Sequence, residues 1–327
     1  MTSPNPPLQH VVLVLSFNGK LDTLACVASL VEGSPEAHVV VIDNGSFDGT
    51  VDEVASRCPA VTILQTGGNL GYTGGMNHGL RWALARGAAA ITVLNNDTVV
   101  PPGAMAALCD DAMGREVAVT PEIRYADGSE RVWFGGGAID PDTNLARHLS
   151  TGELSSRVPD HRGVRPTEVL TGCCITASAE TWRRVGLFDE RYFLNFEDSE
   201  WSVRAVAAGV SLVVDPRVVI HHAVSASFTG SLSYLGTYYY ARNGVLFGRQ
   251  ARGSSLAETA RFLRRHVAPD VIGRVKRHQW EEASRRLLVI GVALSDHARG
   301  RYGQAPRWLA AKAVRWAAER SQGRPRT

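Results

Sequence analysis

The run His10-Val11-Val12-Leu13-Val14-Leu15-Ser16 is continuously apolar and rich in β-branched residues. This pattern is typical of a strand that is buried on both faces of a parallel sheet. Helical spacing follows in residues 21–31, and residues 38–43 form a second apolar run. The three segments together predict a β-α-β unit.

The same alternation of strands and helices continues along the chain. Apolar runs at residues 60–64 and 90–94 predict two more strands, and residues 48–57 and 77–86 predict helices. This order predicts a doubly wound, Rossmann-like α/β sheet. Such folds bind ligands beyond the carboxyl ends of their strands. The segments expected to meet at that rim are 16–18, 43–46, 65–75 and 95–98.

The second half of the chain is less regular. We expect residues 140–167, which are rich in Asp, Arg, Ser and Pro, to form a mobile loop. From residue 234 onward, helical segments are separated by Gly and Pro. The further helices expected are 103–113, 179–185, 198–208, 234–247, 255–266, 271–294 and 306–320, and the further strands 117–121, 169–177 and 211–214.

Length and composition describe an ordinary globular protein. The chain has 327 residues, of which 44% are hydrophobic and 20% charged. These values exclude a disordered chain, a collagen and a disulfide-dense secreted module. We expect one α/β catalytic domain over residues 1–233 and a basic helical region over residues 234–327.

The five cysteines form no C-x-x-C pair, and we interpret them as small buried hydrophobic residues in a reducing compartment. The N-terminus has no signal-peptide pattern, and no apolar run reaches the ~18–20 residues that a membrane span needs. The sequence therefore predicts a cytoplasmic protein.

Charge is distributed unevenly along the chain. Residues 241–327 contain 17 Arg and 2 Lys against 6 acidic residues, a net charge of +13, whereas the whole chain carries only +3. A basic tail of this kind suits an anionic membrane surface or an anionic substrate, and it could equally be a helical face packed on its own acidic body or a homodimer interface. No nucleic-acid partner is expected.

Two strand ends carry groups that suit a nucleotide. Asp43 closes the second strand, where a carboxylate can accept a hydrogen bond from a base or a ribose, although it could equally cap the next helix. The segment 67–77 holds five glycines in nine positions and leads into a helix. Glycines allow the backbone to approach a diphosphate closely, and a helix N-terminus offers free N–H groups. The alternative is a merely flexible loop.

Asn95-Asn96-Asp97 follows the fourth apolar strand. A carboxylate with amide neighbours at the rim is a hard oxygen site for Mg²⁺ or Mn²⁺. One carboxylate alone binds a metal weakly, so phosphate oxygens and a distant ligand are needed. His221 and His222, which follow an apolar run at residues 218–220, are the candidates.

The segment Tyr192–Trp201 concentrates three carboxylates among aromatic residues. Such crowding can raise a carboxyl pKa, which suits a general base that deprotonates a hydroxyl. The alternative is that Asp198 caps the following helix, and that Glu200 pairs with Arg204 one helical turn later.

Taken in order, these motifs resemble the family 2 glycosyltransferases of the GT-A fold, and in particular their rhamnosyltransferase-like subgroup. The resemblance covers about residues 10–245. The matching stretches are residues 12–18, 41–50, 68–77, 94–98, 188–198 and 222–227.

The resemblance implies an inverting, metal-dependent glycosyltransferase on a mixed GT-A sheet. Asp198 matches the family's catalytic base, and Asp97 matches the metal-binding end of its D-x-D motif, of which the first Asp is here Asn95. The C-terminal metal ligand falls on His222, or on His221 if the register slips by one. The donor-binding set implied by the resemblance and the rim is Ser16, Asn18, Asp43, Asn44, Gly68, Asn69, Gly71, Asn77, Asn95 and Asn96.

The implied donor is a nucleoside-diphosphate sugar, dTDP- or UDP-linked, carrying a hexose or a deoxyhexose such as rhamnose. The acceptor is a hydroxyl of a glycan, a lipid-linked intermediate or a natural product. Two alternatives stand beside this reading: a sugar nucleotidyltransferase, and a non-catalytic module that binds carbohydrate or membrane.

Overall fold

The computed structural model describes residues 8–113, 116–157, 163–224 and 231–322. The chain forms two compact units. The first comprises Met1–Ala138, Ala146–Asp189 and Glu197–Val224, and the second comprises Ile139–Leu145, Glu190–Phe196 and Ser225–Thr327. The helical unit thus takes in two short segments from earlier in the chain, and the domain boundary after residue 233 stays a prediction.

The first unit is built on a mixed sheet, as the sequence predicts. The sheet order is β10-β12-β6-β11-β4-β1-β2-β3, with β5 on β12 and β7 on β6. Its elements are β1 (His10–Ser16), α1 (Lys20–Gly33), β2 (His38–Asp43), α2 (Thr50–Arg57), β3 (Thr62–Gln65), α3 (Gly71–Ala85), β4 (Ala90–Asn95), β5 (Thr98–Val99), α4 (Ala104–Ala112), β6 (Val117–Tyr125), β7 (Val132–Phe134), β9 (Ala146–His148), η1 (Ser155–Arg157), β10 (Arg165–Pro166), β11 (Cys174–Ser178), α5 (Ala179–Val185), α6 (Glu197–Ala207) and β12 (Ser211–His222).

The strand register brings the polar strand ends together. The parallel strands β1, β2 and β3 place Ser16 beside Asp43 and Asp43 beside Gln65. On the other side of β1, Leu15 lies beside Asn95 of β4. The long strand β12 is parallel to β6 and ends against β5, just after Asp97. The carboxyl ends of strands from distant parts of the chain therefore meet at one rim.

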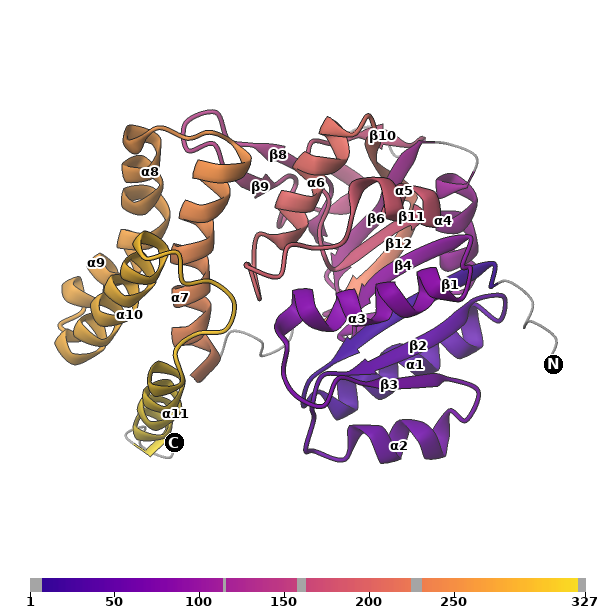
Figure 1. The fold of residues 1–327 in the computed structure, drawn as a ribbon, viewed down its shortest axis with the longest axis horizontal. Coiled ribbons are helices and arrows are strands. Elements are labelled where there is room, and N and C mark those ends of the chain that lie inside the picture. The colour runs from indigo at the N-terminus through magenta and orange to yellow at the C-terminus, as the bar shows by residue number, and fades with distance from the viewer. Residues whose placement is uncertain (1–7, 114–115, 158–162, 225–230, 323–327) are drawn as a thin grey trace. The chain divides into compact units, whose positions relative to one another are not determined.

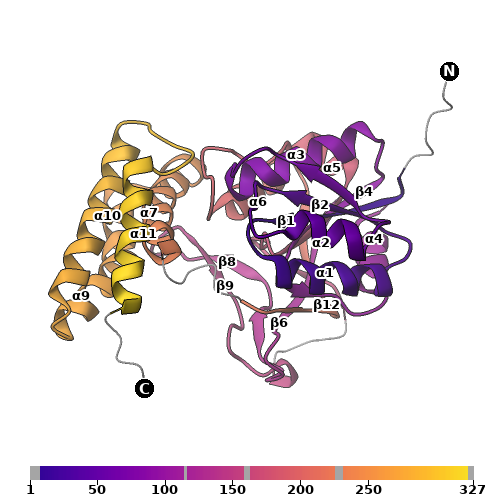
Figure 2. The same cartoon turned by 90° about the horizontal axis from the view of Figure 1, so that it is seen from below.

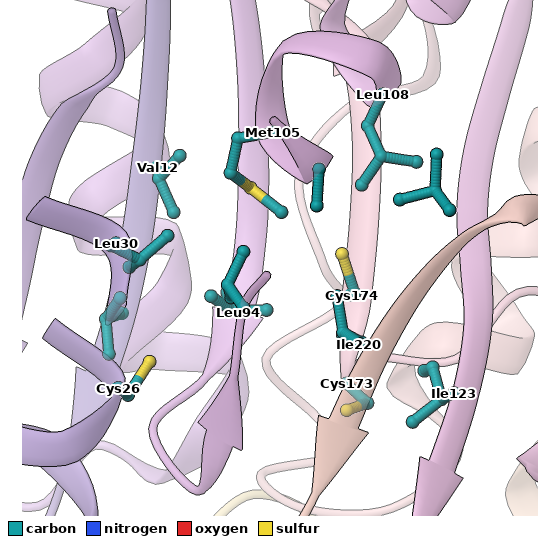
Figure 3. Packing of buried hydrophobic residues seen from close by; sticks show 14 of the residues in the cluster. Val12, Cys26, Leu30, Leu94, Met105, Leu108, Ile123, Cys173, Cys174 and Ile220 are labelled. Carbon is teal, nitrogen blue, oxygen red and sulfur yellow. The ribbon is translucent and has the colours of Figure 1, made fainter. Parts of the chain in front are cut away.

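Apolar residues alternate between two core layers, as expected for strands covered on both faces. Val12 and Val14 face one layer, together with Leu30 of α1 and Met105 of α4. Figure 2 shows α1 and α4 on one side of the sheet and α3 and α5 on the other. Figure 3 shows how Leu30, Met105 and other side chains of the first layer converge around Leu94.

The predicted burial of the cysteines is confirmed for three of the five residues, and the predicted reducing compartment stays a prediction. Cys26, Cys173 and Cys174 are buried in this layer (Figure 3), whereas Cys58 and Cys109 are partly exposed. All five are free thiols. Cys173 and Cys174 both contribute to this layer, and the strand β11 begins at Cys174.

Several other predictions need correction. Residues 140–167 were expected to form a mobile loop, but they contain β9, η1 and β10, with residues 158–162 outside the described part. The strand expected at 211–214 extends to His222, because a bulge between Asp215 and Val219 lets it continue along β6. The helix expected at 271–294 is two helices that break at residues 277–279.

The second unit is helical (Figure 1). The short strand β8 (Gly137–Ile139), which pairs with β9, ends in it. None of the helices that the structure describes is both long and apolar enough to cross a membrane. The helical elements of the second unit are α7 (Ser231–Leu246), η2 (Phe247–Ala251), α8 (Leu256–Phe262), η3 (Leu263–Val267), α9 (Ala268–Lys276), α10 (Trp280–Ala298) and α11 (Arg307–Gln322).

Candidate active site

The centre of the candidate site is a pair between the ends of β4 and β12. Nε2 of His222 lies 2.9 Å from Oδ1 of Asp97, and both side chains are more than nine-tenths buried. The backbone supports the pair, because the N–H of Ala223 donates to the carbonyl of Asp97 over 2.8 Å. Two residues that the sequence predicted as metal ligands are therefore side by side.

The structure distinguishes between the two histidines. His222 lies opposite Thr98 and His221 opposite Val99 in the antiparallel pairing with β5. Successive side chains of a strand point to opposite faces, so the two imidazoles lie on opposite sides of β12. Only His222 lies beside Asp97.

Trp133 of β7 packs against this pair. Its ring meets the His222 ring edge-on, with centroids 4.5 Å apart, and meets the His148 ring in the same manner at 4.9 Å. Burial lowers the pKa of His148, an effect that the nearby charge of Asp198 opposes. Neither Trp133 nor His148 was predicted, because both lie in the part of the chain whose sequence shows no clear periodicity.

Asp198 lies near the start of α6. Hydrogen bonds of Gly172 and Cys173 connect it to the end of β4, which precedes Asp97. The N–H of Gly172 donates to Oδ2 of Asp198 over 2.8 Å, and the carbonyl of Cys173 accepts from the N–H of Asn95 over 2.9 Å. Burial and the charges of Cys174, Asp97 and Asp198 raise the pKa of the Cys173 thiol well above its usual range. The two carboxylates thus share one neighbourhood at the rim.

The hydrogen bonds of Asp198 leave room for a substrate. Oδ1 accepts from the N–H and the hydroxyl of Ser199 over 2.6 and 3.1 Å, whereas Oδ2 accepts only from the N–H of Gly172 within the described part of the chain. A carboxylate oxygen offers two acceptor positions. Oδ2 can therefore accept one further proton donor, such as an acceptor hydroxyl.

The raised carboxyl pKa that the sequence predicts in this segment falls on Glu197. Its side chain is buried, and its Oε2 makes no hydrogen bond in the described structure. Burial, together with the adjacent charge of Asp198, raises the pKa of Glu197 to about 8. The pairing predicted for Glu200 is confirmed, because Arg204 lies 2.7 Å from it across one helical turn.

The ends of β1 and β2 are connected by short polar contacts. The amide oxygen of Asn18 accepts from the N–H of Phe47, and the Asn18 N–H donates to the hydroxyl of Ser46. Oδ1 of Asp43 accepts from the N–H of Ser46 over 3.1 Å, which fixes the carboxylate at the rim. The hydroxyl of Ser16 is fully buried and bonds to Thr23 over 2.8 Å, so only the backbone of Ser16 lies at the rim.

Asn44 organises the glycine-rich segment. It is almost fully buried, accepts from the N–H of Leu70 over 3.0 Å and donates to the carbonyl of Gly71 over 3.0 Å. Oδ1 of Asn69 accepts from the N–H of Gly71. A Cβ on Gly45, whose φ is +85°, would lie 2.7 Å from Cα of Gly68, so the two strand-end loops can touch only because residue 45 is a glycine.

The helix that follows begins at Gly71, six residues earlier than the sequence predicts. Gly75 and Gly79 lie inside it, where a Cβ would come within 2.4 Å of Leu15 and 2.3 Å of Ile42 respectively. These two glycines therefore serve the close packing of α3 on the sheet. Asn77 has a similar structural task, because it exchanges two hydrogen bonds with the backbone of Phe188.

The amides beside Asp97 belong to the frame of the site. Asn95 is the last residue of β4, and its carbonyl accepts from the hydroxyl of Thr98 over 2.8 Å. The Asn96 side chain donates to the hydroxyl of Thr23 over 2.9 Å and fills the space next to Gly19. These contacts hold the turn that presents Asp97.

The residues at the rim fit a divalent ion only in part. Within the described ranges, no group of three His, Cys, Asp or Glu residues could hold a metal. The 2.9 Å between His222 and Asp97 is close to the separation of two adjacent ligands around an ion with ~2.1 Å bonds. Nδ1 of His222 is buried and has no hydrogen-bond partner in the described structure, so the orienting contact that metal-bound histidines normally have is missing. Such a site would need oxygen ligands from a substrate.

Comparison with protein families and curated proteins gives one consistent result. Residues 11–168 match the family model described as "Glycosyl transferase family 2". The chain is 30% identical over 252 residues to the N-acetylglucosaminyl-diphospho-decaprenol L-rhamnosyltransferase of Mycobacterium tuberculosis, covering 71% of this chain and 81% of that protein. It is 24% identical to the dTDP-rhamnosyl transferase RfbF of Shigella flexneri, covering 73% and 79% respectively.

Solved structures with a similar fold include a mannosyltransferase from Pyrobaculum calidifontis in complex with GDP-Man and Mn²⁺. The TM-score is 0.54 at 17% identity, over 98% of this chain and 83% of that one. GalNAc-T7 with UDP, GalNAc and Mn²⁺ gives the same TM-score at 16% identity, over 84% of this chain and 58% of that one, so this chain spans somewhat more than half of GalNAc-T7. At these identities the likeness concerns the fold alone, and it agrees with the fold expected from the sequence.

Proposed function

This chain belongs to the family 2 glycosyltransferases, and on that premise we propose that it transfers a deoxyhexose or hexose, with rhamnose as the first candidate, from a dTDP- or UDP-linked donor to an acceptor hydroxyl with inversion. The α/β unit has the GT-A fold. Family membership displaces the alternatives of a nucleotidyltransferase and of a non-catalytic binding module.

The observation that carries the proposal is the geometry around Asp198. Its Oδ2 keeps an acceptor position, and the hydrogen bonds from Gly172 and Ser199 hold the carboxylate in place. Asp198 would take the proton of the acceptor hydroxyl while the oxygen attacks the anomeric carbon and the bond to the diphosphate breaks. A single displacement inverts the anomeric centre, and no second carboxylate nucleophile is needed.

Asp97 and His222 would hold Mg²⁺ or Mn²⁺ together with the donor diphosphate. When bound, the ion neutralises the charge that develops on the leaving diphosphate. Because these two side chains lie 2.9 Å apart and Nδ1 of His222 has no hydrogen-bond partner in the described structure, we expect weak metal affinity until diphosphate oxygens complete the site. The proposal is supported by the contacts of Asp97 and His222 at the rim and rests on the family for the identity of the ion.

For the nucleoside, the proposal assigns the rim formed by β1, β2 and the loop before α3. Asp43 is positioned by the N–H of Ser46 to contact the base, and Asn18 lies beside it on the neighbouring loop. Gly68 and Asn69 present their backbone along the expected path of the diphosphate. Asn44 stabilises the loop through its hydrogen bonds to Leu70 and Gly71, and Asn77 stabilises α3 through its hydrogen bonds to Phe188.

A lipid-linked acceptor would suit the surface of the second unit. Large apolar side chains are exposed there, with Trp280 exposed by 59%, Leu287 by 57% and Trp308 by 49%. Lys312 lies over the Trp308 ring at 5.8 Å, so cationic and aromatic groups share one surface of α11. Basic and aromatic side chains together favour peripheral contact with an anionic membrane. Co-sedimentation with anionic vesicles at low and high salt tests this part, since absence of a salt-sensitive bound fraction would contradict it.

Donor hydrolysis without an acceptor tests the central proposal. We expect slow release of the sugar from a dTDP- or UDP-sugar in the presence of Mn²⁺, with the first-formed sugar in the anomeric configuration opposite to the donor. NMR spectra recorded before mutarotation distinguish the two anomers. Release with retained configuration would contradict the single displacement.

A further inference from the structure

A cavity of about 450 Å³ that is open to solvent lies on the second unit. Its wall is formed by side chains of α7, η3, α9 and α10, and by Asn195 from the short segment that precedes α6. The volume is within the ~300–1,000 Å³ that small-molecule sites occupy. None of its residues takes part in the chemistry at the rim of the first unit.

Arg286 is the most deeply buried polar residue of the cavity. It is only 3% exposed, and its Nη1 donates to the carbonyl of Ser233 over 2.6 Å. The hydroxyls of Ser233 and Thr237 accept its other terminal hydrogen bonds. Nε makes no hydrogen bond within the described structure, but it lies 3.5 Å from Oδ2 of Asp270 and 3.5 Å from Oε1 of Glu282. Its charge is therefore already paired with two carboxylates.

Charge in the cavity is nearly balanced. Asp270 lies 3.0 Å from Arg274 and 3.5 Å from Arg286. Glu282, just behind the wall, lies 3.4 Å from Arg274 and 3.5 Å from Arg286. An anionic ligand would face these two carboxylates, whereas a neutral ligand with several hydroxyls would find both donors and acceptors. The balance therefore favours a polyol over a phosphate.

The cavity also has an aromatic edge. The ring of Tyr240 is 37% exposed and lies 5.8 Å from the ring of Phe262, on which His266 stacks at 6.0 Å. Tyr240 and His266 both line the cavity. An apolar ring surface beside hydroxyl and amide groups matches a pyranose, which has both C–H and O–H faces.

We propose that this cavity binds the saccharide part of the acceptor substrate, a neutral sugar of one or two hexose rings. The inference rests on the proposed function, because a glycosyltransferase needs a second, hydroxyl-bearing substrate besides its donor. Asn195 of the cavity wall stands three residues before Asp198 in the chain.

Ligand-observed NMR with the full-length protein tests the cavity. The probes are N-acetylglucosamine, the methyl glycosides of rhamnose, galactose and mannose, and inorganic pyrophosphate. We expect at least one neutral sugar to bind, and its Kd to rise about 10-fold or more in a Tyr240→Ala/His266→Ala variant, since the aromatic edge is lost. Thr237→Val, which keeps the shape of the cavity but removes a hydroxyl, should weaken the same sugar with less effect on folding.

Three results would overturn the proposal: no sugar binds, the sugar binds the variants and the wild-type protein equally, or only pyrophosphate responds to the variants. An Arg249→Ala variant, which changes an exposed residue outside the cavity, is the matched control. Binding of dTDP or UDP with Mn²⁺ is measured on the same samples. If the wild-type protein binds the nucleotide but no sugar, only the proposed sugar site is contradicted. If the wild-type protein binds no nucleotide, the proposed function is contradicted.

Discussion

The two units of this chain handle buried charge in different ways. In the first unit, Asp97 and His222 lie at the ends of strands, and Asp198 lies near a helix start, where its Oδ2 keeps an acceptor position. In the second unit, Arg242 is fully buried. Its guanidinium donates hydrogen bonds to the carbonyl of Gly303, the hydroxyl of Tyr238 and the amide oxygen of Asn243. The rim thus keeps a charged group with an open acceptor position, whereas the guanidinium of Arg242 is held by hydrogen bonds inside the protein.

The basic composition of residues 241–327 does not by itself indicate an anionic ligand. Several of its arginines are paired inside the unit, as Arg274 is with Asp270 and Arg285 is with Glu281 and Glu319. These cations are compensated by their neighbours. Pairing of this kind covers only part of the positive charge, and residues 241–327 still carry a net charge of +13.

The largest effect is expected from the proposed base. Asp198→Asn should reduce transfer roughly 10²–10⁴-fold, because the amide cannot accept the acceptor proton. Binding of the nucleoside diphosphate should be nearly unchanged, since the amide oxygen of the asparagine can still accept the hydrogen bond from the N–H of Gly172. Steady-state rates and a nucleotide titration check the two parts. Turnover comparable to the wild type would remove Asp198 from the role of base.

The next test addresses the buried arginine of the second unit. Arg242→Met should lower the free energy of unfolding by about 3 kcal/mol, because the carbonyl of Gly303 and the hydroxyl of Tyr238 lose a buried donor. Urea unfolding measures the change. Arg249→Met, at an exposed position in the same unit, is the control and should change stability by less than about 0.5 kcal/mol. Equal effects of the two variants would contradict the structural role of Arg242.

Glu197 provides a pH-dependent test within the first unit. Its pKa rises from 4.5 to about 8 in the folded protein, mainly through burial. The folded state therefore holds a proton that the unfolded chain has released, and stability should fall as the pH rises between these two values. Glu197→Gln cannot titrate, so its stability relative to the wild type should grow by about 3 kcal/mol between about pH 5 and pH 8.

Urea unfolding at several pH values measures this advantage. Glu180→Gln, at an exposed position of α5, should show no such trend. A stability difference between Glu197→Gln and the wild type that does not depend on pH would show that Glu197 is ionised in the folded protein.

The smallest expected effect separates the two histidines. Asp97→Ala and His222→Ala should each weaken Mn²⁺-dependent binding of the nucleoside diphosphate by about 10-fold, because each removes one ligand of a site that has few. His221→Ala is the matched control, since its side chain lies on the other face of β12. Calorimetric titration with UDP or dTDP, with and without EDTA, provides the measurement. A loss in His221→Ala that equals the loss in His222→Ala would contradict the assignment.

The sequence predicts the first unit much better than the second. Apolar periodicity locates β1, β2 and β4 within one residue, and the rule that ligands bind at strand ends places Asp43 and Asp97 at the rim. It cannot show that Gly75 and Gly79 serve helix packing, because that depends on Leu15 and Ile42 of neighbouring strands.

The remaining features depend on contacts between distant segments. Trp133 lies beside His222 only through the pairing of β7 with β6, and the raised pKa falls on Glu197 because its side chain points inward. The cavity of the second unit arises where four helical elements meet, which no local pattern encodes. The motif residues 225–227 lie outside the described part of the chain.

The central claim is a metal-assisted nucleotide-sugar site at the rim of the first unit, and a thermal-shift series with UDP, dTDP and GDP tests it most directly. A ligand at 100 times its Kd stabilises the folded state by about 2.7 kcal/mol. The account predicts that dTDP or UDP raises the melting temperature by several degrees with Mn²⁺ and much less with EDTA. Equal stabilisation with and without the metal, or none by any of the three nucleotides, would contradict it.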